Sequence, residues 1–303
     1  MHYGFIGLGN LGRNLAGSLI REGFQVTVTD IDRKNAEPLL AKGAHWAGSA
    51  KEVAEAVDAV ITCLPSPKVS EKVLTAPDGI IAGLKKGATW IEMSTLDTES
   101  VERLSKVAAD AGIRMMEAPV TGGVHLAASG EITVIAGGDA DLFELHKPAF
   151  QAMGNQIFHA GELGKAAVIK VITNMLAFIH LCATGEALML AKKGGIDLTQ
   201  AFHIIKASSG NSFVHETEGQ VILNGSYNIN FTMDLALKDL GFALGFGREF
   251  GVPLELAGLV EQTFVRAKAM YGGQAWSSQV VKLLEDATGT DLRAPGFPAE
   301  IEA

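Results

Sequence analysis

The chain has 303 residues, of which 48% are hydrophobic and 19% are charged, a composition typical of a compact folded protein rather than a disordered one. Its length allows two domains with a substantial core. The net charge is −9 and no basic run is present, which argues against nucleic acid as the main partner.

The cysteines and the start of the chain bear on its compartment. Cys63 and Cys182 lie far apart in apolar surroundings. A disulfide between them stays open, but two reduced thiols are the simpler expectation. Because the first predicted strand begins near residue 3, we expect no signal peptide or transit segment before it. These features favour a cytoplasmic protein.

The first predicted strand, Tyr3 to Leu8, leads directly into a glycine-rich turn, GLGNLG, at Gly7 to Gly12. A helix with apolar residues at helical spacing follows and ends near Gly23. A second strand, Gln25 to Thr29, is closed by Asp30, 18 residues after Gly12. This order of elements predicts a dinucleotide-binding unit: a strand, a GxGxxG turn, a helix, a second strand and an acidic residue.

Each glycine of the turn has a physical reason. Gly7 permits the tight turn, Gly9 lets a pyrophosphate approach the backbone, and Gly12 lets the helix pack on the sheet. Asn10 and Leu11 complete the predicted cofactor loop. The helix that follows offers its N–H groups and positive dipole end to the phosphates.

Asp30 bears on the choice of cofactor. Its carboxylate is expected to accept hydrogen bonds from the adenosine ribose and to repel a 2′-phosphate, which favours NAD over NADP. Arg33 lies close enough in sequence to soften that preference.

The alternation of strands and helices continues to about residue 161. Because strand ends on this edge of a doubly wound sheet line the cofactor crevice, Leu64 and Pro65 should border it. Thr95 follows another strand end, where it either contacts the cofactor or serves only as a turn or cap residue. Strands are predicted at Ala59–Leu64, Thr89–Met93, Ile113–Ala118, Ile132–Ala136 and Gln156–Phe158, and helices at Thr98–Ala111 and Asp141–Ala152. We therefore expect an α/β Rossmann domain, with a mostly parallel doubly wound sheet, over residues 1–161.

One long helix, about residues 164–194, is predicted next. It contains no proline and is apolar on nearly every side, so we expect it to be buried, with Val168, Ile172, Met175 and Ile179 inside. A polar stripe is predicted along one face of the helix, because four residues follow at i, i+3, i+4 and i+7: Lys170, Thr173, Asn174 and Ala177. Lys170 either extends to solvent or lies in a cleft with a lowered pKa. Because polar residues interrupt it, we do not expect a membrane span.

After this helix the pattern is helical only. Five further helices are predicted, at Leu198–Ser208, Glu216–Leu223, Thr232–Phe250, Glu255–Tyr271 and Ser277–Asp286. No alternating strand pattern of useful length follows residue 195. Residues 162–303 should therefore form an all-helical domain that begins with the long helix.

Several spaced motifs resemble those of one family, the β-hydroxyacid dehydrogenases typified by 3-hydroxyisobutyrate dehydrogenase. In chain order they are GFIGLGNLG from Gly4, CLP from Cys63, EMST from Glu92, EAPVTGG from Glu117, GELGKAAVIKVITN from Gly161 and LALKDL from Leu235. The resemblance covers residues 4 to about 279. It implies a Rossmann domain, a long interdomain helix, a helical C-terminal domain for substrate and oligomerisation, and usually a homodimer or homotetramer.

The resemblance also implies roles for particular residues. Lys170 falls on the catalytic lysine, Asn174 on the substrate-orienting asparagine, and Lys238 on a lysine near the nicotinamide that contacts substrate and cofactor. The loop that holds the substrate's anionic group falls on Thr121, Gly122 and Gly123. For Lys238, a surface pair with its neighbour Asp239 is the alternative. His125, beside the anion loop, is either a substrate contact or an ordinary loop histidine.

The chemistry of the residues agrees with these roles. Oxidation of a hydroxyl needs a base for its proton while hydride leaves carbon, and a lysine serves if burial or a second cation lowers its pKa. No metal is implied. We therefore predict an NAD(P)-dependent enzyme that interconverts a small β-hydroxy acid and its semialdehyde.

The substrate stays open. Thr121 stands where the family usually has serine, and Thr173 stands where it usually has asparagine. Alternatives are a reductase of another small aldehyde acid, of the tartronate semialdehyde, succinic semialdehyde or sulfolactaldehyde type. A non-catalytic dinucleotide-binding scaffold is the alternative from another class, and the presence of Lys170 with Asn174 argues against it.

Overall fold

The computed structural model describes residues 1–301. By its internal contacts the chain divides into two compact units, Met1–Lys170 and the residues from Val171 onward. The division falls inside one helix, α8, Lys165–Lys193. The domain boundary expected after residue 161 stays a prediction. Neither cysteine of the described chain is in a disulfide.

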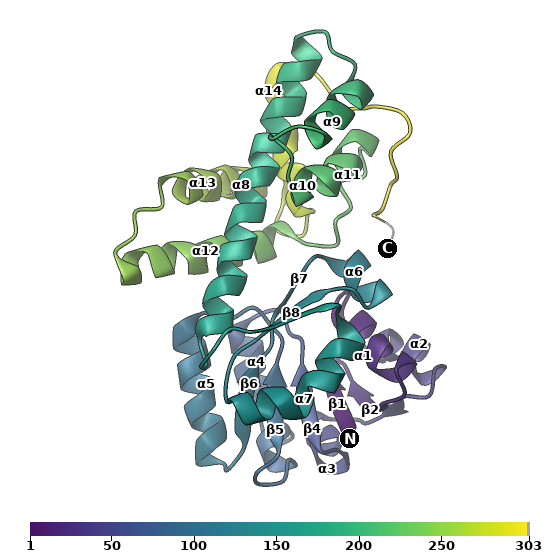
Figure 1. Ribbon diagram of the computed structural model, residues 1–303, viewed down its shortest axis with the longest axis vertical. Helices are drawn as coiled ribbons and strands as arrows, with labels where there is room; N and C mark the ends of the chain where they lie inside the picture. The colour runs from purple at the N-terminus through teal and green to yellow at the C-terminus, as the bar shows by residue number, and fades with distance from the viewer. Residues whose placement is uncertain (302–303) are drawn as a thin grey trace. The chain divides into compact units, whose positions relative to one another are not determined.

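The first unit is built on a six-stranded parallel sheet in the order β3-β2-β1-β4-β5-β6 (Figure 1). The strands are β1 His2–Ile6, β2 Gln25–Thr29, β3 His45–Trp46, β4 Ala59–Thr62, β5 Thr89–Glu92 and β6 Arg114–Glu117. This is the strand order of the doubly wound dinucleotide-binding fold, which confirms the predicted fold class.

A smaller sheet follows in the same unit. In it, β7 (Val120–Thr121) pairs antiparallel with β8 (Thr133–Ala136), and β8 pairs parallel with β9 (Gln156–His159). The sequence indicated β8 and β9 but neither β3 nor β7. Two residues are too few to carry an alternating pattern, so both short strands escaped prediction.

Helices cover both faces of the large sheet, and the strands supply alternating residues to two cores. Phe5, Ile61 and Ile91 enter the core beneath α1, α2, α6 and α7, whereas Val60 and Trp90 enter the core beneath α3, α4 and α5. Period-two alternation of this kind is what a sheet buried on both faces requires. The helices are α1 Gly12–Arg21, α2 Glu37–Leu40, α3 Ala50–Ala56, α4 Pro67–Thr75, α5 Thr98–Asp110, α6 Val124–Ser129 and α7 Ala140–Met153, with short 3₁₀ turns η1 Arg33–Ala36 and η2 Ile80–Ala82.

The second unit is helical, as predicted. No strand lies between residue 195 and residue 301, the last residue described, and only isolated bridges occur there. Its helices are α9 Leu198–Lys206, α10 Phe213–Glu216, α11 Glu218–Asn224, α12 Met233–Phe250, α13 Glu255–Tyr271 and α14 Lys282–Thr288, with η3 Ser277–Val281. The predicted helix Glu216–Leu223 corresponds to α11, and the sequence did not indicate the short α10 before it. The predicted helix Ser277–Asp286 is a 3₁₀ turn followed by α14.

Helix α8 is continuous, with 29 residues and a length of about 43 Å at 1.5 Å per residue. Its buried positions differ from the prediction. Ile172 is 37% exposed and Val168, Met175 and Ile179 are only half-buried, whereas Val171, Phe178 and Leu181 are buried. The prediction was wrong because α8 is apolar on all sides. Its composition therefore does not show which of its faces other parts of the chain cover.

Among the described helices, α8 is the one long and apolar enough to cross a membrane by length and composition alone. Its side chains nevertheless enter the protein's cores. Ala167 belongs to a core of the first unit, and Phe178, Leu181, Leu188 and Met189 belong to the core of the second. This packing is typical of a central helix in a folded protein.

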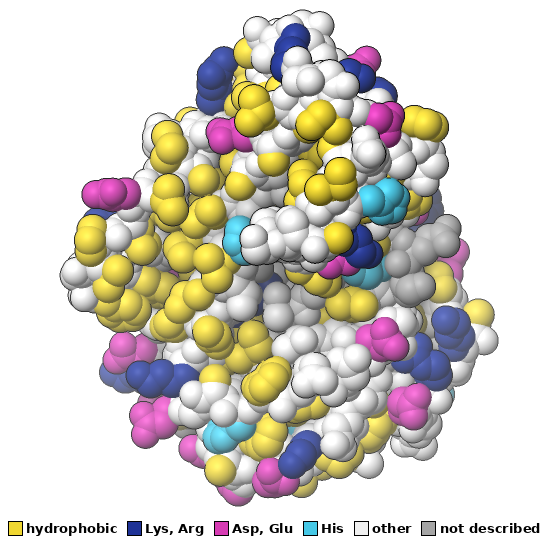
Figure 2. Space-filling model, turned by 45° about the horizontal axis from the view of Figure 1, so that its top comes forward, with side chains coloured by type: hydrophobic (Ala, Val, Ile, Leu, Met, Phe, Trp, Pro, Cys, Tyr) yellow, Lys and Arg dark blue, Asp and Glu magenta, His cyan; other side chains and the backbone are white. Residues whose placement is uncertain are grey.

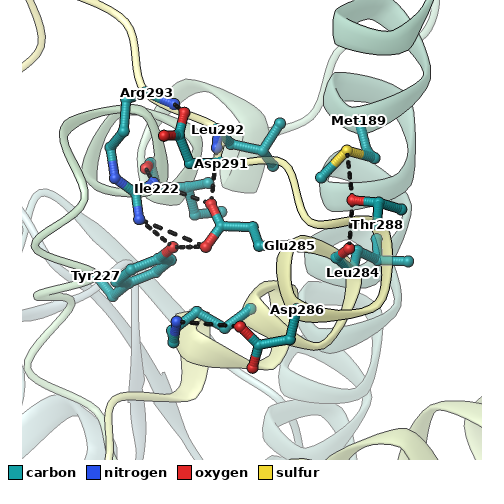
Figure 3. A network of polar contacts seen from close by, with 11 residues as sticks. Met189, Ile222, Tyr227, Leu284, Glu285, Asp286, Thr288, Asp291, Leu292 and Arg293 are labelled. Carbon is teal, nitrogen blue, oxygen red and sulfur yellow. Dashed lines mark hydrogen bonds and ion pairs between the residues drawn. The ribbon is translucent and has the colours of Figure 1, made fainter.

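A buried polar cluster fastens the C-terminal segment to the second unit (Figure 3). Glu285 of α14 accepts hydrogen bonds from the N–H of Leu292 at 2.8 Å, from the hydroxyl of Tyr227, and from Arg293 at 3.0 Å. Arg293 also donates to the carbonyl of Ile222, at the end of α11, at 3.0 Å. The chain beyond α14 is therefore held against the residues that follow α11.

Candidate functional site

The predicted cofactor loop has the geometry that its glycines suggested. Gly7 has φ +95°, and an added Cβ there would meet the carbonyl oxygen of Cys63 at 2.4 Å. A Cβ on Gly12 would meet the carbonyl oxygen of Gly7 at 2.0 Å, whereas nothing lies within 4 Å of one on Gly9. Gly7 and Gly12 therefore keep the loop and α1 close, and Gly9 leaves open space of the kind a pyrophosphate needs. These residues fit a bound dinucleotide.

Asp30 has a structural role that the sequence did not reveal. Its Oδ2 accepts the N–H of Leu8, inside the glycine loop, at 2.6 Å. Its Oδ1 accepts the N–H of Asp32 at 2.8 Å and Nδ2 of Asn35 at 3.1 Å. A carboxylate offers about four acceptor positions, so three are used within the protein and one is left for a ribose hydroxyl. The side chain predicted to bind the cofactor thus also holds the glycine loop.

The ends of four strands lie side by side at this edge of the sheet. Ile6 of β1 is paired with Thr62 of β4, Thr62 with Glu92 of β5, and Glu92 with Glu117 of β6. The residues that follow these ends include the glycine loop, Leu64 with Pro65, and Thr95. Parallel strands bring their carboxyl ends to one edge, which is where such folds bind ligands.

A buried acid supports this edge. The Glu92 carboxyl is fully buried, and burial raises its pKa. Glu92 accepts the N–H of Ser94 at 2.7 Å, and the Ser94 hydroxyl accepts the N–H of Leu64 at 2.7 Å. Leu64 and Thr95 are half-buried and Pro65 is exposed. The EMST motif had drawn attention to this strand end, but Thr95 and not Ser94 was predicted as the site residue.

The predicted anion loop follows β6 and β7. Gly122 and Gly123 have φ of +124° and +94°, a region that favours glycine. Added Cβ atoms would meet the Leu126 side chain at 2.8 Å and the His125 ring at 3.0 Å. Thr121 and His125 are half-buried, and burial lowers the pKa of His125. Gly123 is exposed, and neither position has room for a larger residue.

Lys170 lies in the second turn of α8 and is 8% exposed. The solvent-extended alternative does not fit this burial. The start of the helix is held by Glu117, whose carboxylate accepts the N–H groups of Gly164, Ala166 and Ala167 at 2.6, 3.0 and 3.1 Å. Asn174 follows Lys170 by one helical turn on the same continuous helix.

In the second unit, Asp239 contacts two predicted site residues. Its carboxylate, 1% exposed, accepts Nδ2 of Asn174 at 2.6 Å and lies 3.2 Å from Nζ of Lys238. Nζ of Lys238 also lies 5.4 Å from the centre of the Phe242 ring. Because Asp239 is buried, Lys238 and Asp239 do not form a surface pair. The sequence had marked Asp239 only as the neighbour of Lys238.

The predicted residues thus form two groups, each within one unit. The first holds the glycine loop, Asp30, the strand ends, the anion loop and Lys170, and the second holds Asn174 and Lys238. Their roles toward a ligand stay predictions. No group of three or more His, Cys, Asp or Glu side chains suited to a metal ion occurs in residues 1–301.

Two family models match the chain, and together they cover most of it. The NAD binding domain of 6-phosphogluconate dehydrogenase matches residues 2–161. The NAD-binding domain of NADP-dependent 3-hydroxyisobutyrate dehydrogenase matches residues 164–284.

Proteins of similar sequence and structure match this chain over nearly its full length. The chain is 34% identical to 2-(hydroxymethyl)glutarate dehydrogenase of Eubacterium barkeri, over 95% of this chain and 96% of that protein. It is 33% identical to 3-hydroxyisobutyrate dehydrogenase of Pseudomonas aeruginosa, over 90% of this chain and 95% of the relative. A crystal structure of 3-hydroxyisobutyrate dehydrogenase from Salmonella typhimurium has 29% identity and a TM-score of 0.87, covering 93% of this chain and 99% of that one. The chain belongs to the β-hydroxyacid dehydrogenase family, and it is an NAD(P)-dependent oxidoreductase that acts on the CH–OH group of a hydroxy acid.

Proposed function

We propose that the protein interconverts a small β-hydroxy acid and its semialdehyde, with Lys170 as the general acid/base. The burial of Lys170, one turn before Asn174, is the observation that carries this assignment. A buried ammonium is destabilised relative to the neutral amine, which suits a group that must accept a proton near neutral pH.

The chain's residues take distinct parts in the reaction. Nζ of Lys170 accepts the hydroxyl proton of the substrate, and in the reverse direction returns it to the developing alkoxide. A bound nicotinamide supplies the hydride acceptor. The Asn174 side chain hydrogen-bonds the substrate and fixes its orientation, with its Nδ2 held by Asp239. The backbone of Gly122 and Gly123, with Thr121, receives the substrate's carboxylate or an equivalent anion.

We propose NAD as the preferred cofactor. The supporting observation is Asp30, whose carboxylate stands at the end of β2 with one acceptor position left for the ribose. Arg33 is the nearby cation that would soften this preference, and its guanidinium lies 5.4 Å from the centre of the Trp46 ring.

Turnover of a substrate panel tests the activity. The panel should contain 3-hydroxyisobutyrate, 2-(hydroxymethyl)glutarate, glycerate, 4-hydroxybutyrate and a sulfonate analogue, each with NAD and NADP, followed by the absorbance of the reduced nicotinamide. Tartronate semialdehyde, succinic semialdehyde and sulfolactaldehyde are tested in the reducing direction. No turnover of any of them would favour a scaffold that only binds the dinucleotide.

Two variants test the role of Lys170. Lys170→Ala should lower kcat by about 10²–10⁴-fold, the usual effect of losing a proton-transfer group, with nearly unchanged NAD affinity. Lys170→Arg should not restore activity, because a guanidinium stays protonated near neutral pH. A nearly normal Arg variant would contradict the assignment.

We also propose that the protein is a homodimer or homotetramer. Exposed large apolar residues on the second unit support this, among them Ile172 and Leu176 of α8 and Leu256 and Leu259 of α13. Figure 2 shows hydrophobic side chains gathered in groups on the face that it draws. Light scattering should give a mass of two or four chains. Leu176→Asp should reduce this mass, whereas Leu145→Asp, at a similarly exposed position on α7, should not.

The proposed ligands are small molecules, and we propose no role for nucleic acid or membrane. A cytoplasmic location stays a prediction, and microscopy of the tagged protein in its cell of origin would test it.

A further inference from the structure

Glu117 is a buried acid that the proposed chemistry does not use. It ends β6, is 2% exposed, and accepts three backbone N–H groups from a segment 47 to 50 residues later in the chain. Oε1 accepts the N–H groups of Gly164 and Ala166, and Oε2 accepts the N–H of Ala167. Burial raises the pKa of Glu117 to about 7, and the three donors oppose that rise.

The first turn of α8 needs these acceptors. Helix starts leave N–H groups without intrahelical partners, and a polar side chain at the preceding residue usually receives them. The residue before α8 is Gly164, which has no side chain and has φ +89°. The remaining N–H of that turn, from Lys165, donates to the carbonyl of Glu162 at 3.2 Å. Glu117 therefore replaces the missing local cap.

The carboxylate is itself held in a fixed frame. The backbone of Glu117 is hydrogen-bonded in both directions to Gly137, at 3.0 and 2.8 Å. A Cβ on Gly137 would lie 2.5 Å from Oε1 of Glu117, so a glycine there leaves the space that the carboxylate occupies. Four residues after Glu117 the chain reaches Thr121 and the anion loop.

Lys170 lies one helical turn beyond Ala166, on the same side of α8. A slip of one residue at the helix start would move every following side chain by about 1.5 Å along the axis and 100° around it. We propose that Glu117 is a positioning residue, which fixes the start of α8 on β6 and so places Lys170 relative to the anion loop. The inference deepens the proposed function and rests on Lys170 as its acid/base.

Glu117→Gln tests this in the full-length protein. The glutamine amide keeps one acceptor oxygen. Its NH₂ group replaces the other oxygen and faces a backbone N–H donor that the Glu117 carboxylate accepts in the unchanged protein. The control is Glu285→Gln, a change at another buried carboxylate that accepts a backbone N–H, that of Leu292, in the second unit.

Three measurements are made on both variants and on the unchanged protein. Hydrogen exchange of residues 162–168 reports the helix start, and acetylation of Lys170 against pH, followed by mass spectrometry, reports the state of its amine. We expect faster exchange of the helix start and a changed pH dependence of Lys170 acetylation in Glu117→Gln only. We also expect kcat to fall about 10–100-fold, as for a catalytic group misplaced by about 1 Å, with little change in KM for NAD.

Other results would overturn the inference. A folded Glu117→Gln protein with unchanged Lys170 labelling would do so, whether or not its kcat or its melting temperature falls. If the unchanged protein turns over no hydroxy acid but the variant still shifts exchange and labelling, the proposed function fails and the placement of Lys170 by Glu117 stands. Should Glu117→Gln not fold, Gly137→Ala serves instead, because its methyl group displaces the same carboxylate while the charge is kept.

Discussion

Asp30→Asn tests the cofactor assignment with the smallest change of shape. The substitution removes the charge at the end of β2 and keeps one acceptor oxygen. In the structure its carboxylate accepts the N–H of Leu8 in the glycine loop, the N–H of Asp32 and Nδ2 of Asn35. By our proposal it also accepts a ribose hydroxyl.

The magnitude follows from these contacts. A hydrogen bond to a charged group contributes about 1.5–3 kcal/mol, which corresponds to about 10- to 150-fold in affinity. We therefore expect kcat/KM with NAD to fall within that range. With NADP it should fall less or rise, because the repulsion between the carboxylate and a 2′-phosphate is removed.

The assay is kcat/KM for each cofactor at a saturating concentration of the best substrate, with affinities from calorimetry. Asp32→Asn is the matched control, since that carboxylate caps the short η1 turn through the N–H of Lys34 and does not contact the loop. Its ratio of NAD to NADP use should stay close to the unchanged protein's. Equal or better use of NADP before any mutation would refute the reasoning. Equal losses for both cofactors in Asp30→Asn would show that the residue acts only through the loop.

Gly9→Ala should weaken NAD binding but leave the melting temperature nearly unchanged, because its methyl group enters open space. Gly12→Ala should destabilise the fold, because its methyl group would lie 2.0 Å from the carbonyl oxygen of Gly7. Thermal unfolding of both variants, with and without NAD, tests this. Asp239→Asn removes the negative charge that contacts both Asn174 and Lys238. We expect kcat/KM for the hydroxy acid to fall about tenfold or more, with little change in KM for NAD. Unchanged kinetics would contradict this. His146 is 1% exposed, and burial lowers its pKa to about 4. Between about pH 6.5 and pH 4 the unfolded chain therefore binds a proton at this residue that the folded chain does not. The contribution to the free energy of unfolding should be complete above about pH 6.5 and should fall by up to about 3 kcal/mol as the pH drops to about 4. Urea unfolding at several pH values should show a weaker acid dependence in His146→Gln, and an identical one would count against the assignment.

The elements that the sequence predicted well have a regular pattern of their own. Buried strands such as Gln25–Thr29 and long helices such as Glu255–Tyr271 were predicted with the ends that the structure gives them. The two-residue strands β3 and β7 were missed because pairing with neighbours, rather than local pattern, defines them. The same limit applies to α8, whose ends were predicted within one residue but whose buried face was not.

The candidate site shows a similar division. Motifs and spacing pointed to the glycine loop, Lys170 and Asn174, because a ligand constrains residues close together in sequence. The acids that support them were not predicted as such. Asp239 and Glu117 act across 65 and 47 or more residues of sequence, and no local spacing signals such a pairing.

The helix that joins the two units also limits how the protein can be divided. A fragment that ends at residue 161 lacks Gly164, Ala166 and Ala167, and so leaves the Glu117 carboxylate with none of its three N–H donors. Hydrogen bonds to a charged acceptor contribute about 1.5–3 kcal/mol each, so the loss of three removes a large share of a domain's stability. The nucleotide-binding half is therefore not autonomous when cut where its strand pattern stops, and a soluble, folded fragment should need the first turns of α8 to be retained.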